Sequence, residues 1–348
     1  MSVYNDLIQN LLKMNSKNFP ILSLMFLSLV FFSCKKESQD CLLDQEILDM
    51  EITMEIERLE DKFYEAKAPG EILYLLEAYP EFAENYLQVG LYGSYEDFAN
   101  ELILSNEDSL MISLYQEVKK EFNDISGLEE DLLVAFKHIK YFFPEFKVPK
   151  VYTFVSGFAS DIYIDKDILV IGLDYYLPFE HRYQPPDLPQ YITKRYQEEY
   201  LVPMIVTAIS SQFNQTDLSQ NSLLAEMIYY GKAYHFTKSM LPCTPDDYII
   251  GYTQEEVTAC FDNEVYIWSY FVENDLLYTT NPFEIRKYIG EAPSTDEISP
   301  EAPGRLGRWL GWNIVDDYTL NNKVSLPELM LESDTEKIFR RSGYKPRL

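Results

Sequence analysis

The sequence contains few of the residues from which catalytic and metal sites are most often built. Its 348 residues include only three histidines, four cysteines and 13 glycines. It has no H-E-x-x-H pair, in which two histidines one helical turn apart hold zinc, and no C-x-x-C pair for thiol chemistry. It also has no glycine-rich phosphate loop. These absences argue against the usual zinc peptidases, thiol oxidoreductases and nucleotide-binding enzymes.

Basic residues are scarce as well. The chain has 29 Lys and Arg against 57 Asp and Glu, a net charge of −28. This excess of negative charge argues against binding to nucleic acid or electrostatic docking on anionic lipid, because both need basic side chains. Apolar residues, in contrast, make up 47% of the chain and include 28 tyrosines and 21 phenylalanines. We therefore expect a folded protein with a large core.

The N-terminus has the pattern of a secretion signal. Lys13 and Lys17 precede a mainly apolar run over residues 19–32, and Met14 is an alternative start of the chain. A membrane-spanning helix takes roughly 20 residues, so this run is too short to be a comfortable anchor. Basic residues, an apolar run and a small residue before the cleavage point are typical of a signal peptide.

The signal ends in a cysteine that we expect to be lipid-modified. Ser33-Cys34 and the polar residues behind it resemble a bacterial lipobox, although Phe31 stands where leucine is usual. Acylation of Cys34 would hold the chain stably on a membrane, because two acyl chains suffice where one does not. A free cysteine near an ordinary cleavage site is the alternative. Lys35, directly after the cysteine, favours transfer to the outer membrane, where the protein would face the periplasm. Attachment to the inner membrane is the alternative.

The chain divides into four expected segments. They are a signal peptide (1–33), a lipidated tether (34–41), an N-terminal helical region (42–145), and a sheet plus helical region (146–348) that forms one domain with the preceding helices. The fold class is α+β, predominantly helical, with a small central sheet of two or three strands over 150–176, where Val, Ile, Tyr and Phe are concentrated. Apolar spacing and Pro or Gly breaks predict helices over 42–67, 71–79, 94–104, 106–122, 128–142, 189–213, 221–241, 254–274, 282–289 and 305–321. The loop "GEAPSTDEISPEAPG" separates the last two, and a short helix and an extended basic tail close the chain.

Three cysteines remain once Cys34 is acylated: Cys41, Cys243 and Cys260. An odd number in an oxidising compartment leaves at least one thiol unpaired. A disulfide bond between Cys243 and Cys260 is one possibility, and two unpaired, buried thiols are the other.

The sequence offers no catalytic constellation. The histidines His138, His181 and His235 stand alone, the first and third on predicted helices and the second in a loop, and we expect each to be structural. Ser156-Gly157 in "VSGFAS" is only half of the G-x-S-x-G motif of serine hydrolases. We therefore expect no catalytic residue, no metal ligand and no cofactor.

Acidic pairs occur at Glu198-Glu199, Glu255-Glu256 and Asp316-Asp317, all on predicted helices. Adjacent residues on a helix point in different directions, so the two carboxylates of such a pair do not face a common point. A carboxylate pair brought together from separate elements stays open, because sequence alone does not exclude it.

The helix over residues 221–241 contains an apolar and aromatic stripe made by Leu223, Met227, Tyr230 and Tyr234. A glycine inside a helix costs about 1 kcal/mol, so we expect Gly231 to mark a close contact with a neighbouring element. Lys232 is expected to point away, and the whole segment is adequately explained as a core helix.

Several motifs together resemble the GldB family of gliding-motility lipoproteins of Bacteroidetes-type bacteria. They are the lipobox, "VYTFVSGFASDIYIDKDILVIGLDYYL" (151–177), "AEMIYYGKAYHF" (225–236), "GRWLGWNIVDDY" (307–318) and the closing "LPELM" and "SGYKPR". The resemblance implies an envelope lipoprotein needed for surface gliding, a motility linked in that group to a dedicated protein-secretion machinery.

A fainter similarity is to the scaffold of gluzincin-type metallopeptidases. The resemblance would place H-E-x-x-H in "YLVPMIVTAISSQF" (200–213), which has no histidine, and an acidic ligand where Tyr230 stands. If the similarity is correct, the chain has no side chains at these positions that could bind zinc, and it is a degenerate peptidase scaffold reused for binding.

Three functions remain open. The favoured one is a non-enzymatic assembly or scaffold lipoprotein of the gliding and associated secretion machinery, with other envelope proteins as partners and the membrane as its attachment. The second is a periplasmic ligand-binding module that uses the vestigial cleft. The third is an active metallopeptidase-like hydrolase with unusual ligands.

Overall fold

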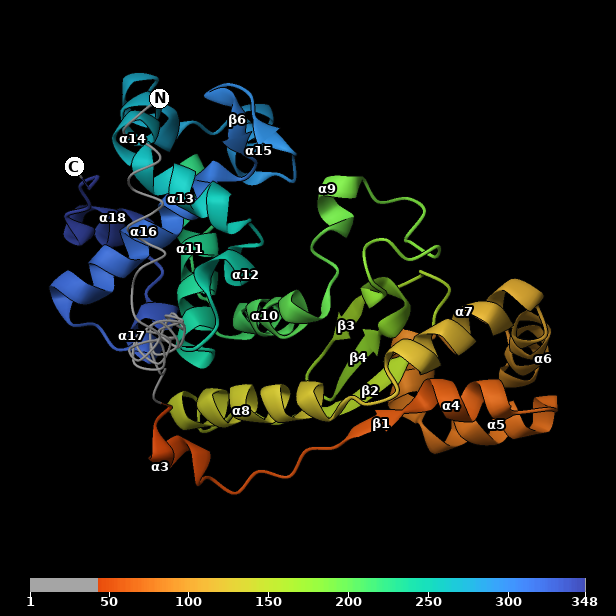
Figure 1. Cartoon of the computed structure of the whole chain (residues 1–348). Coiled ribbons are helices and arrows are strands. Elements are labelled where there is room, and N and C mark those ends of the chain that lie inside the picture. The colour runs from red at the N-terminus through yellow and green to blue at the C-terminus, as the bar shows by residue number, and fades with distance from the viewer. Residues whose placement is uncertain (1–42, 348) are drawn as a thin grey trace, which may run out of the picture. The chain divides into compact units, whose positions relative to one another are not determined.

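The β-sheet expected over 150–176 lies between the N-terminal and C-terminal helices in the computed structural model, which describes residues 43–347 (Figure 1). Its strands are β1 (Ile56–Arg58), β2 (Lys150–Phe154), β3 (Ile162–Ile164) and β4 (Ile168–Gly172). They lie in the order β1-β2-β4-β3; β1 and β4 run parallel to β2, and β3 pairs antiparallel with β4. The α+β, predominantly helical fold class is therefore confirmed.

The helices before the sheet follow the predicted pattern from residue 69 onward. They are α3 (Gln45–Leu48), α4 (Leu59–Glu65), α5 (Pro69–Ala78), α6 (Tyr95–Asn106), α7 (Ser109–Glu121) and α8 (Ser126–Phe142), with a π-helical turn (Phe82–Tyr86) and a 3-10 turn (Val89–Tyr92) that the sequence did not indicate. The side chains of Ser94 and Asp108 accept hydrogen bonds from the first backbone N–H groups of α6 and α7. Such N-caps explain why these two helices begin where they do.

The predicted helix over 42–67 is wrong. Its apolar spacing is real, but only α3 and α4 are helical, and residues between them are extended and form β1. Ile56 pairs with Val151 across the sheet, and its side chain is buried. Pairing with the edge of β2 and burial of Ile56 thus override the local helical pattern.

The C-terminal part is almost entirely helical. Its elements are α9 (Gln190–Thr193), α10 (Glu198–Ile209), a 3-10 turn (Ser210–Gln212), α11 (Leu223–Met240), α12 (Asp246–Ile250), α13 (Gln254–Asp262), α14 (Glu264–Glu273), a 3-10 turn (Leu276–Tyr278), α15 (Pro282–Ile289), β5 (Ser294–Thr295), β6 (Ser299–Pro303), α16 (Leu306–Asn322), α17 (Leu326–Leu331) and α18 (Thr335–Ser342). The predicted helices over 221–241, 282–289 and 305–321 are confirmed.

Three C-terminal predictions need correction. The segment 189–213 is broken between α9 and α10, where the Tyr196 hydroxyl donates a hydrogen bond to Asp161 at 2.6 Å and ties the chain to the sheet. The segment 254–274 divides into α13 and α14 at Asn263, and the "GEAPSTDEISPEAPG" loop contains the small β5–β6 hairpin. These breaks depend on tertiary contacts that local propensity does not report.

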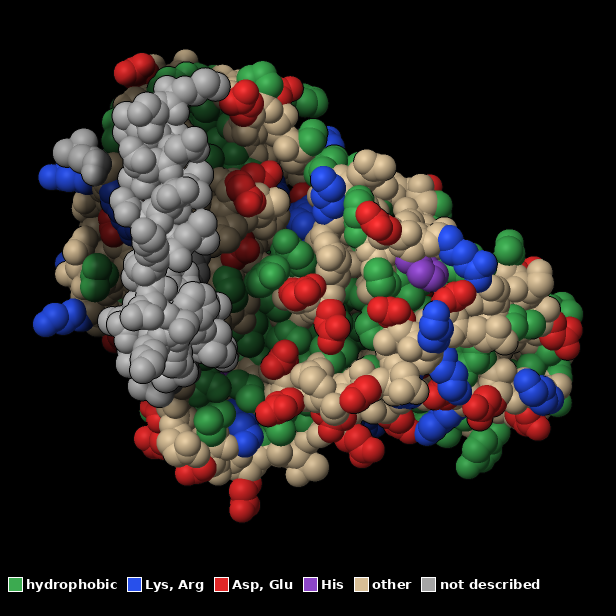
Figure 2. All heavy atoms as spheres, viewed as in Figure 1, with side chains coloured by type: hydrophobic (Ala, Val, Ile, Leu, Met, Phe, Trp, Pro, Cys, Tyr) green, Lys and Arg blue, Asp and Glu red, His purple; other side chains and the backbone are tan. Residues whose placement is uncertain are grey.

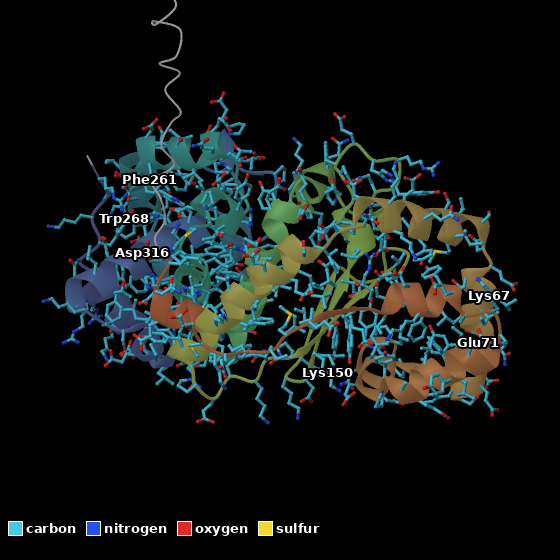
Figure 3. The ribbon with its side chains drawn as sticks, turned by 60° about the horizontal axis from the view of Figure 1, so that its bottom comes forward. Lys67, Glu71, Lys150, Phe261, Trp268 and Asp316 are labelled. Carbon is cyan, nitrogen blue, oxygen red and sulfur yellow. The ribbon has the colours of Figure 1, made fainter. Side chains whose placement is uncertain are left out.

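The closing basic tail is docked rather than extended. After α18, the buried Tyr344 donates a hydrogen bond to the buried carboxylate of Glu264 at 2.7 Å. Its ring also packs edge-on against Trp268 with a centroid distance of 5.1 Å. Figure 3 shows Trp268 and Phe261 among the C-terminal helices, and the Arg347 guanidinium lies 5.1 Å from the Phe261 ring centroid.

The sheet separates two hydrophobic cores. Tyr152, Phe154 and Val170 join the core formed with α4, α5 and α6. Val151 and Leu169 face the opposite way and join the larger core, which includes α8 and most C-terminal helices. Successive residues of a strand point to opposite faces, so each half of the protein is built on one face of the same short strands.

The helices α11 and α16 cross at two glycines, Gly231 and Gly311. A Cβ atom added to Gly231 would lie 2.3 Å from the Gly311 carbonyl oxygen, and one added to Gly311 would lie 1.9 Å from the Met227 carbonyl oxygen. The two backbones are therefore in direct contact. The expected close contact at Gly231 is confirmed, and its partner is the glycine of "RWLGW".

Lys232, expected to point away, is instead fully buried. Its Nζ donates hydrogen bonds to the carbonyl oxygens of Met330 (3.2 Å) and Glu332 (2.8 Å), at the C-terminal end of α17. Burial lowers the pKa of Lys232 from its ordinary 10.5 to about 7, although the negative charge of Glu332 opposes the shift. The lysine thus donates hydrogen bonds to backbone carbonyl groups at the end of α17, where a helix leaves its last carbonyls unpaired.

The buried lysine predicts a pH-dependent stability. Lys232 has a lower pKa folded than unfolded, so the unfolded chain binds the extra proton between about pH 7 and 10.5, and stability should rise with pH across that window. Relative to Lys232→Met, the wild type should gain about 2 kcal/mol in unfolding free energy from pH 7 to pH 9, since each pH unit is worth at most about 1.4 kcal/mol. Urea unfolding of both proteins at the two pH values measures this. A difference that does not change with pH would contradict the assignment.

Candidate functional site

The three histidines lie on separate elements. His138 on α8 is buried, and its Nδ1 lies 2.8 Å from a carbonyl oxygen of the preceding helical turn. His181 lies in the loop after β4, with Nε2 3.5 Å from the Glu117 carboxylate. His235 on α11 has Nδ1 2.6 Å from the Asp316 carboxylate on α16. The structure places each histidine where the sequence predicts, on a helix or in a loop, and does not bring them together.

Ser156 closes the turn that follows β2. Its Oγ accepts hydrogen bonds from the backbone N–H of Ala159 (3.0 Å) and of Ser160 (3.2 Å). The buried Asp174 supports the same turn by accepting a hydrogen bond from the backbone N–H of Phe158 at 2.6 Å. Burial raises the pKa of Asp174 to about 6, although backbone hydrogen bonds from Phe158 and Ser156 oppose it. These contacts explain the serine as part of a turn.

The acidic pairs lie on helices as predicted. Glu198-Glu199 and Glu255-Glu256 are in the first turns of α10 and α13, where negative charge suits the helix dipole. Asp316 of the third pair bonds to His235. Within residues 43–347, no group of three or more His, Cys, Asp and Glu side chains is arranged to hold a metal ion.

The cysteine prediction needs correction. Cys260 is a free, buried thiol, so it forms no bond with Cys243. Cys243 is itself disulfide-bonded and lines a cavity together with Leu43. Cys34, the expected acylation site, and Cys41 both lie outside the described residues.

A second cavity stands out by its chemistry. It has a volume of about 460 Å³ and lies among α9, α10, α11, α12 and the start of α16. Its wall contains three arginines and one glutamate among aromatic side chains: Arg195, Arg305, Arg308, Glu291, Tyr196, Tyr200, Tyr234 and Tyr248. We call this set of residues the cationic cleft. In Figure 2, blue Lys and Arg side chains lie at the hollow between α9 and the C-terminal helices.

The three guanidinium groups of the cationic cleft share the single carboxylate of Glu291. Arg195 Nη2 lies 2.7 Å from Oε2, Arg305 Nε 3.5 Å from Oε2, and Arg308 Nη1 3.3 Å from Oε1. Among the residues that line this cavity, three positive charges and one negative charge leave an excess of two positive charges, in a chain whose net charge is −28. The cluster is therefore a local region of positive charge in a negatively charged protein.

Backbone geometry holds two of these arginines in place. Arg305 has a left-handed backbone (φ 65°) and donates hydrogen bonds to the last carbonyls of α12, Ile250 O (3.0 Å) and Gly251 O (2.9 Å). Gly251 is also left-handed (φ 71°), and a Cβ there would lie 2.8 Å from the Arg195 side chain. The end of α12 is thus shaped to receive both guanidinium groups.

Aromatic rings and burial complete the electrostatics. The Arg308 guanidinium lies 4.0 Å from the Tyr230 ring centroid and that of Arg305 lies 5.3 Å from the Tyr252 ring centroid, distances typical of cation–π contacts. The Arg305 and Arg308 side chains are only 7% and 12% exposed. Burial opposes ionisation of Glu291, but the three arginines outweigh it and lower the pKa of that carboxyl. The cluster stays charged at neutral pH.

The cationic cleft adjoins the positions that the metallopeptidase resemblance singles out. Met204, Thr207 and Ala208 of α10, from the stretch without histidine, line the cavity. Tyr230, which stands where an acidic ligand would be expected, is covered by the Arg308 guanidinium. A fixed positive charge at this place disfavours a metal cation.

The cationic cleft was not predicted from the sequence. Arg305 and Arg308 are three residues apart at the start of α16, but Arg195 and Glu291 come from other segments. The one available signal was the scarcity of arginine and lysine, which makes an "R-x-x-R" pair followed by tryptophan unusual in so acidic a chain.

The comparison with known families supports the resemblance found in the motifs. A family model described as gliding motility protein GldB matches residues 40–346. No curated protein and no solved structure matches the chain. In the described part of the chain, no helix has the length and apolar character needed to cross a membrane. Because the family match covers most of the sequence, the chain belongs to the GldB family of gliding motility proteins.

Proposed function

We propose that this protein is a membrane-anchored lipoprotein required for gliding motility, and that it acts as a non-enzymatic assembly component of the gliding and associated secretion machinery. The observation that carries the proposal is the GldB match over residues 40–346, which begins six residues after the cysteine of the lipobox pattern at Ser33-Cys34. The family supplies the motility role, the lipobox supplies attachment to a membrane, and Lys35 favours the outer membrane, facing the periplasm, over the inner membrane.

The surface of the described region supports a role in contacts with other envelope proteins. Large aromatic side chains are exposed on several helices, among them Tyr74 (70%), Tyr266 (58%) and Phe283 (79%). Aromatic residues are enriched in protein interfaces. Mild cross-linking of the anchored protein in native envelopes, followed by purification, should recover components of the gliding or secretion apparatus. Recovery of this chain alone would contradict the assembly role.

Loss of the acylated cysteine should release the protein from the membrane. In Cys34→Ala, the expected acylation cannot occur, and the acidic chain has no electrostatic affinity for anionic lipid to replace it. Fractionation of cells should move the variant from the membrane to the soluble fraction while the folded region keeps its unfolding midpoint. A variant that stays in the membrane fraction would refute the lipid anchor.

Acylation of Cys34 would also assign the disulfide partner of Cys243. With the proposed thioether on the Cys34 sulfur and a free thiol at Cys260, Cys41 would be the remaining cysteine. Leu43, two residues beyond it, lines the same cavity as Cys243. Peptide mapping without reduction should yield a peptide pair joined through Cys41 and Cys243. Alkylation of Cys243 in the native, unreduced protein would contradict this pairing.

A further inference from the structure

The cationic cleft has more positive charge than its own carboxylate can neutralise. We propose that it binds a free carboxylate carried on an apolar or aromatic body. The terminal carboxylate of an extended peptide and a small organic acid share this chemistry. The inference does not depend on the lipid anchor or on the motility role.

The charge argument starts from burial. The Arg305 and Arg308 side chains are almost completely removed from water, and Glu291 is the one carboxylate within 4 Å of them among the described residues. Charges of one sign in a low-dielectric cleft attract a counter-ion much more strongly than surface charges do. An anionic group entering the cleft would balance part of the excess of two positive charges.

The geometry favours a carboxylate. Glu291 shows that the three guanidinium groups converge on a carboxylate, with N–O distances of 2.7 to 3.5 Å. Within the described residues, the Arg195 guanidinium makes a single hydrogen bond, to Glu291, and a guanidinium carries five N–H donors. Its remaining donors suit a second carboxylate, because arginine binds such groups through two parallel hydrogen bonds.

The rest of the cavity suits an apolar body. Leu188, Ile192 and Met204 line it together with the rings of Tyr200 and Tyr248, which pack edge-to-face at 5.0 Å. A cavity of about 460 Å³ lies in the range of small-molecule sites, which combine apolar walls with a few placed polar groups. A short side chain or ring next to the carboxylate would fill this space.

Calorimetric titration of the full-length, detergent-solubilised protein tests the proposal. The probes are an N-acetylated tripeptide ending in phenylalanine, the same tripeptide as its C-terminal amide, phenylpropionate and inorganic phosphate. The free acid should bind at least ten times more tightly than the amide, and its affinity should fall with salt. Binding of phenylpropionate but not the tripeptide would support the site and identify a small acid as the source. Equal binding of acid and amide, no binding of either acid, or preference for phosphate would overturn the proposal.

Matched variants locate the binding. Arg195→Gln should weaken binding of the acid about tenfold or more, since it removes a charged donor at the cleft. Glu291→Gln should strengthen binding, because it removes the competing carboxylate. Arg182→Gln is the control: that arginine is exposed, pairs with Glu117 and is no part of the cleft, so affinity should not change. Unchanged affinity in Arg195→Gln, with folding intact, would contradict the assignment.

Discussion

Replacing Gly311 by alanine should lower the free energy of unfolding by about 3 kcal/mol or more. The new Cβ would lie 1.9 Å from the Met227 carbonyl oxygen and 2.5 Å from its carbonyl carbon, distances that no side-chain rotation relieves. The helices α11 and α16 would have to move apart, and overpacking that shifts backbone costs about 1 to 3 kcal/mol, occasionally more. This crossing supports much of the larger core, since both helices contribute many of its buried residues.

The control for this prediction is Gly127→Ala. Gly127 also belongs to a helix, in the first turn of α8, but a Cβ there would meet nothing within 4 Å. Alanine in a helix is favoured over glycine by about 1 kcal/mol, so this variant should be as stable as the wild type or slightly more stable. Urea unfolding followed by circular dichroism measures both. Gly311→Ala with wild-type stability would show that the two helices do not cross as described.

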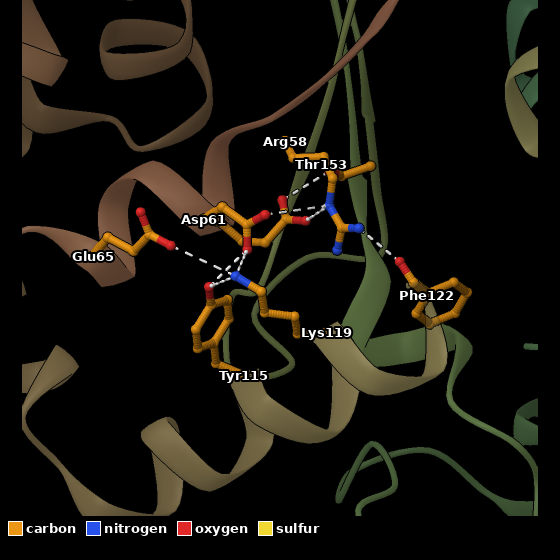
Figure 4. A network of polar contacts seen from close by, with 8 residues as sticks. Arg58, Asp61, Glu65, Tyr115, Lys119, Phe122 and Thr153 are labelled. Atoms are coloured by element: carbon orange, nitrogen blue, oxygen red, sulfur yellow. Dashed lines mark hydrogen bonds and ion pairs between the residues drawn. The ribbon is translucent and has the colours of Figure 1, made fainter. Parts of the chain in front are cut away.

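Replacing Glu60 by alanine should cost about 3 kcal/mol of stability. Glu60 lies in the first turn of α4 and is fully buried. It accepts hydrogen bonds from Arg58 Nε (2.7 Å) and from the Thr153 hydroxyl on β2 (2.7 Å), and Figure 4 labels both of these partners. Removing one member of a buried ion pair costs about 3 to 5 kcal/mol. The Arg58 side chain is 20% exposed and keeps a second carboxylate, that of Asp61, at 3.8 Å, so the lower value applies.

Two further variants separate charge from position. Glu65 lies on the same helix, but its carboxylate is 70% exposed and 3.6 Å from Lys119 at the surface. Glu65→Ala should therefore lower the free energy of unfolding by less than about 0.5 kcal/mol. Burial raises the pKa of Glu60 despite the hydrogen bonds from Thr153 and Arg58. Glu60→Gln, which stays neutral, can accept the Arg58 hydrogen bond through its one amide oxygen and can donate from its NH2 group to the Thr153 hydroxyl, so it should lose less than Glu60→Ala. Equal losses in Glu60→Ala and Glu65→Ala would contradict the buried pair.

The sequence was informative where local pattern and tertiary environment agree. The dense Val, Ile and Tyr content around "ILVIGL" predicts β4, whose residues are all buried, and capping residues such as Ser94 explain the helix starts. The sequence misled where tertiary contacts decide. Ile56 follows a helical spacing but pairs with β2, and Lys232 looks like a surface residue but donates to the end of α17.

The candidate sites differ in the same way. The lipobox at Cys34 is a contiguous pattern, so sequence alone can propose it. The cationic cleft is assembled from Arg195, Glu291 and the start of α16, and each of these residues is unremarkable in its own stretch of sequence. The β5–β6 hairpin returns the chain from Glu291 to Arg305 and Arg308, and the end of α12 at Gly251 meets the side chains of both Arg195 and Arg305.

We propose that this GldB-family chain serves gliding as an anchored lipoprotein. Colony spreading and single-cell gliding, measured in a gliding bacterium that carries this protein after deletion of its coding sequence, test this role. We expect deletion to abolish gliding, the wild-type protein to restore it, and Cys34→Ala, produced at the same level, to fail to do so. Normal gliding in the deletion strain would contradict the account.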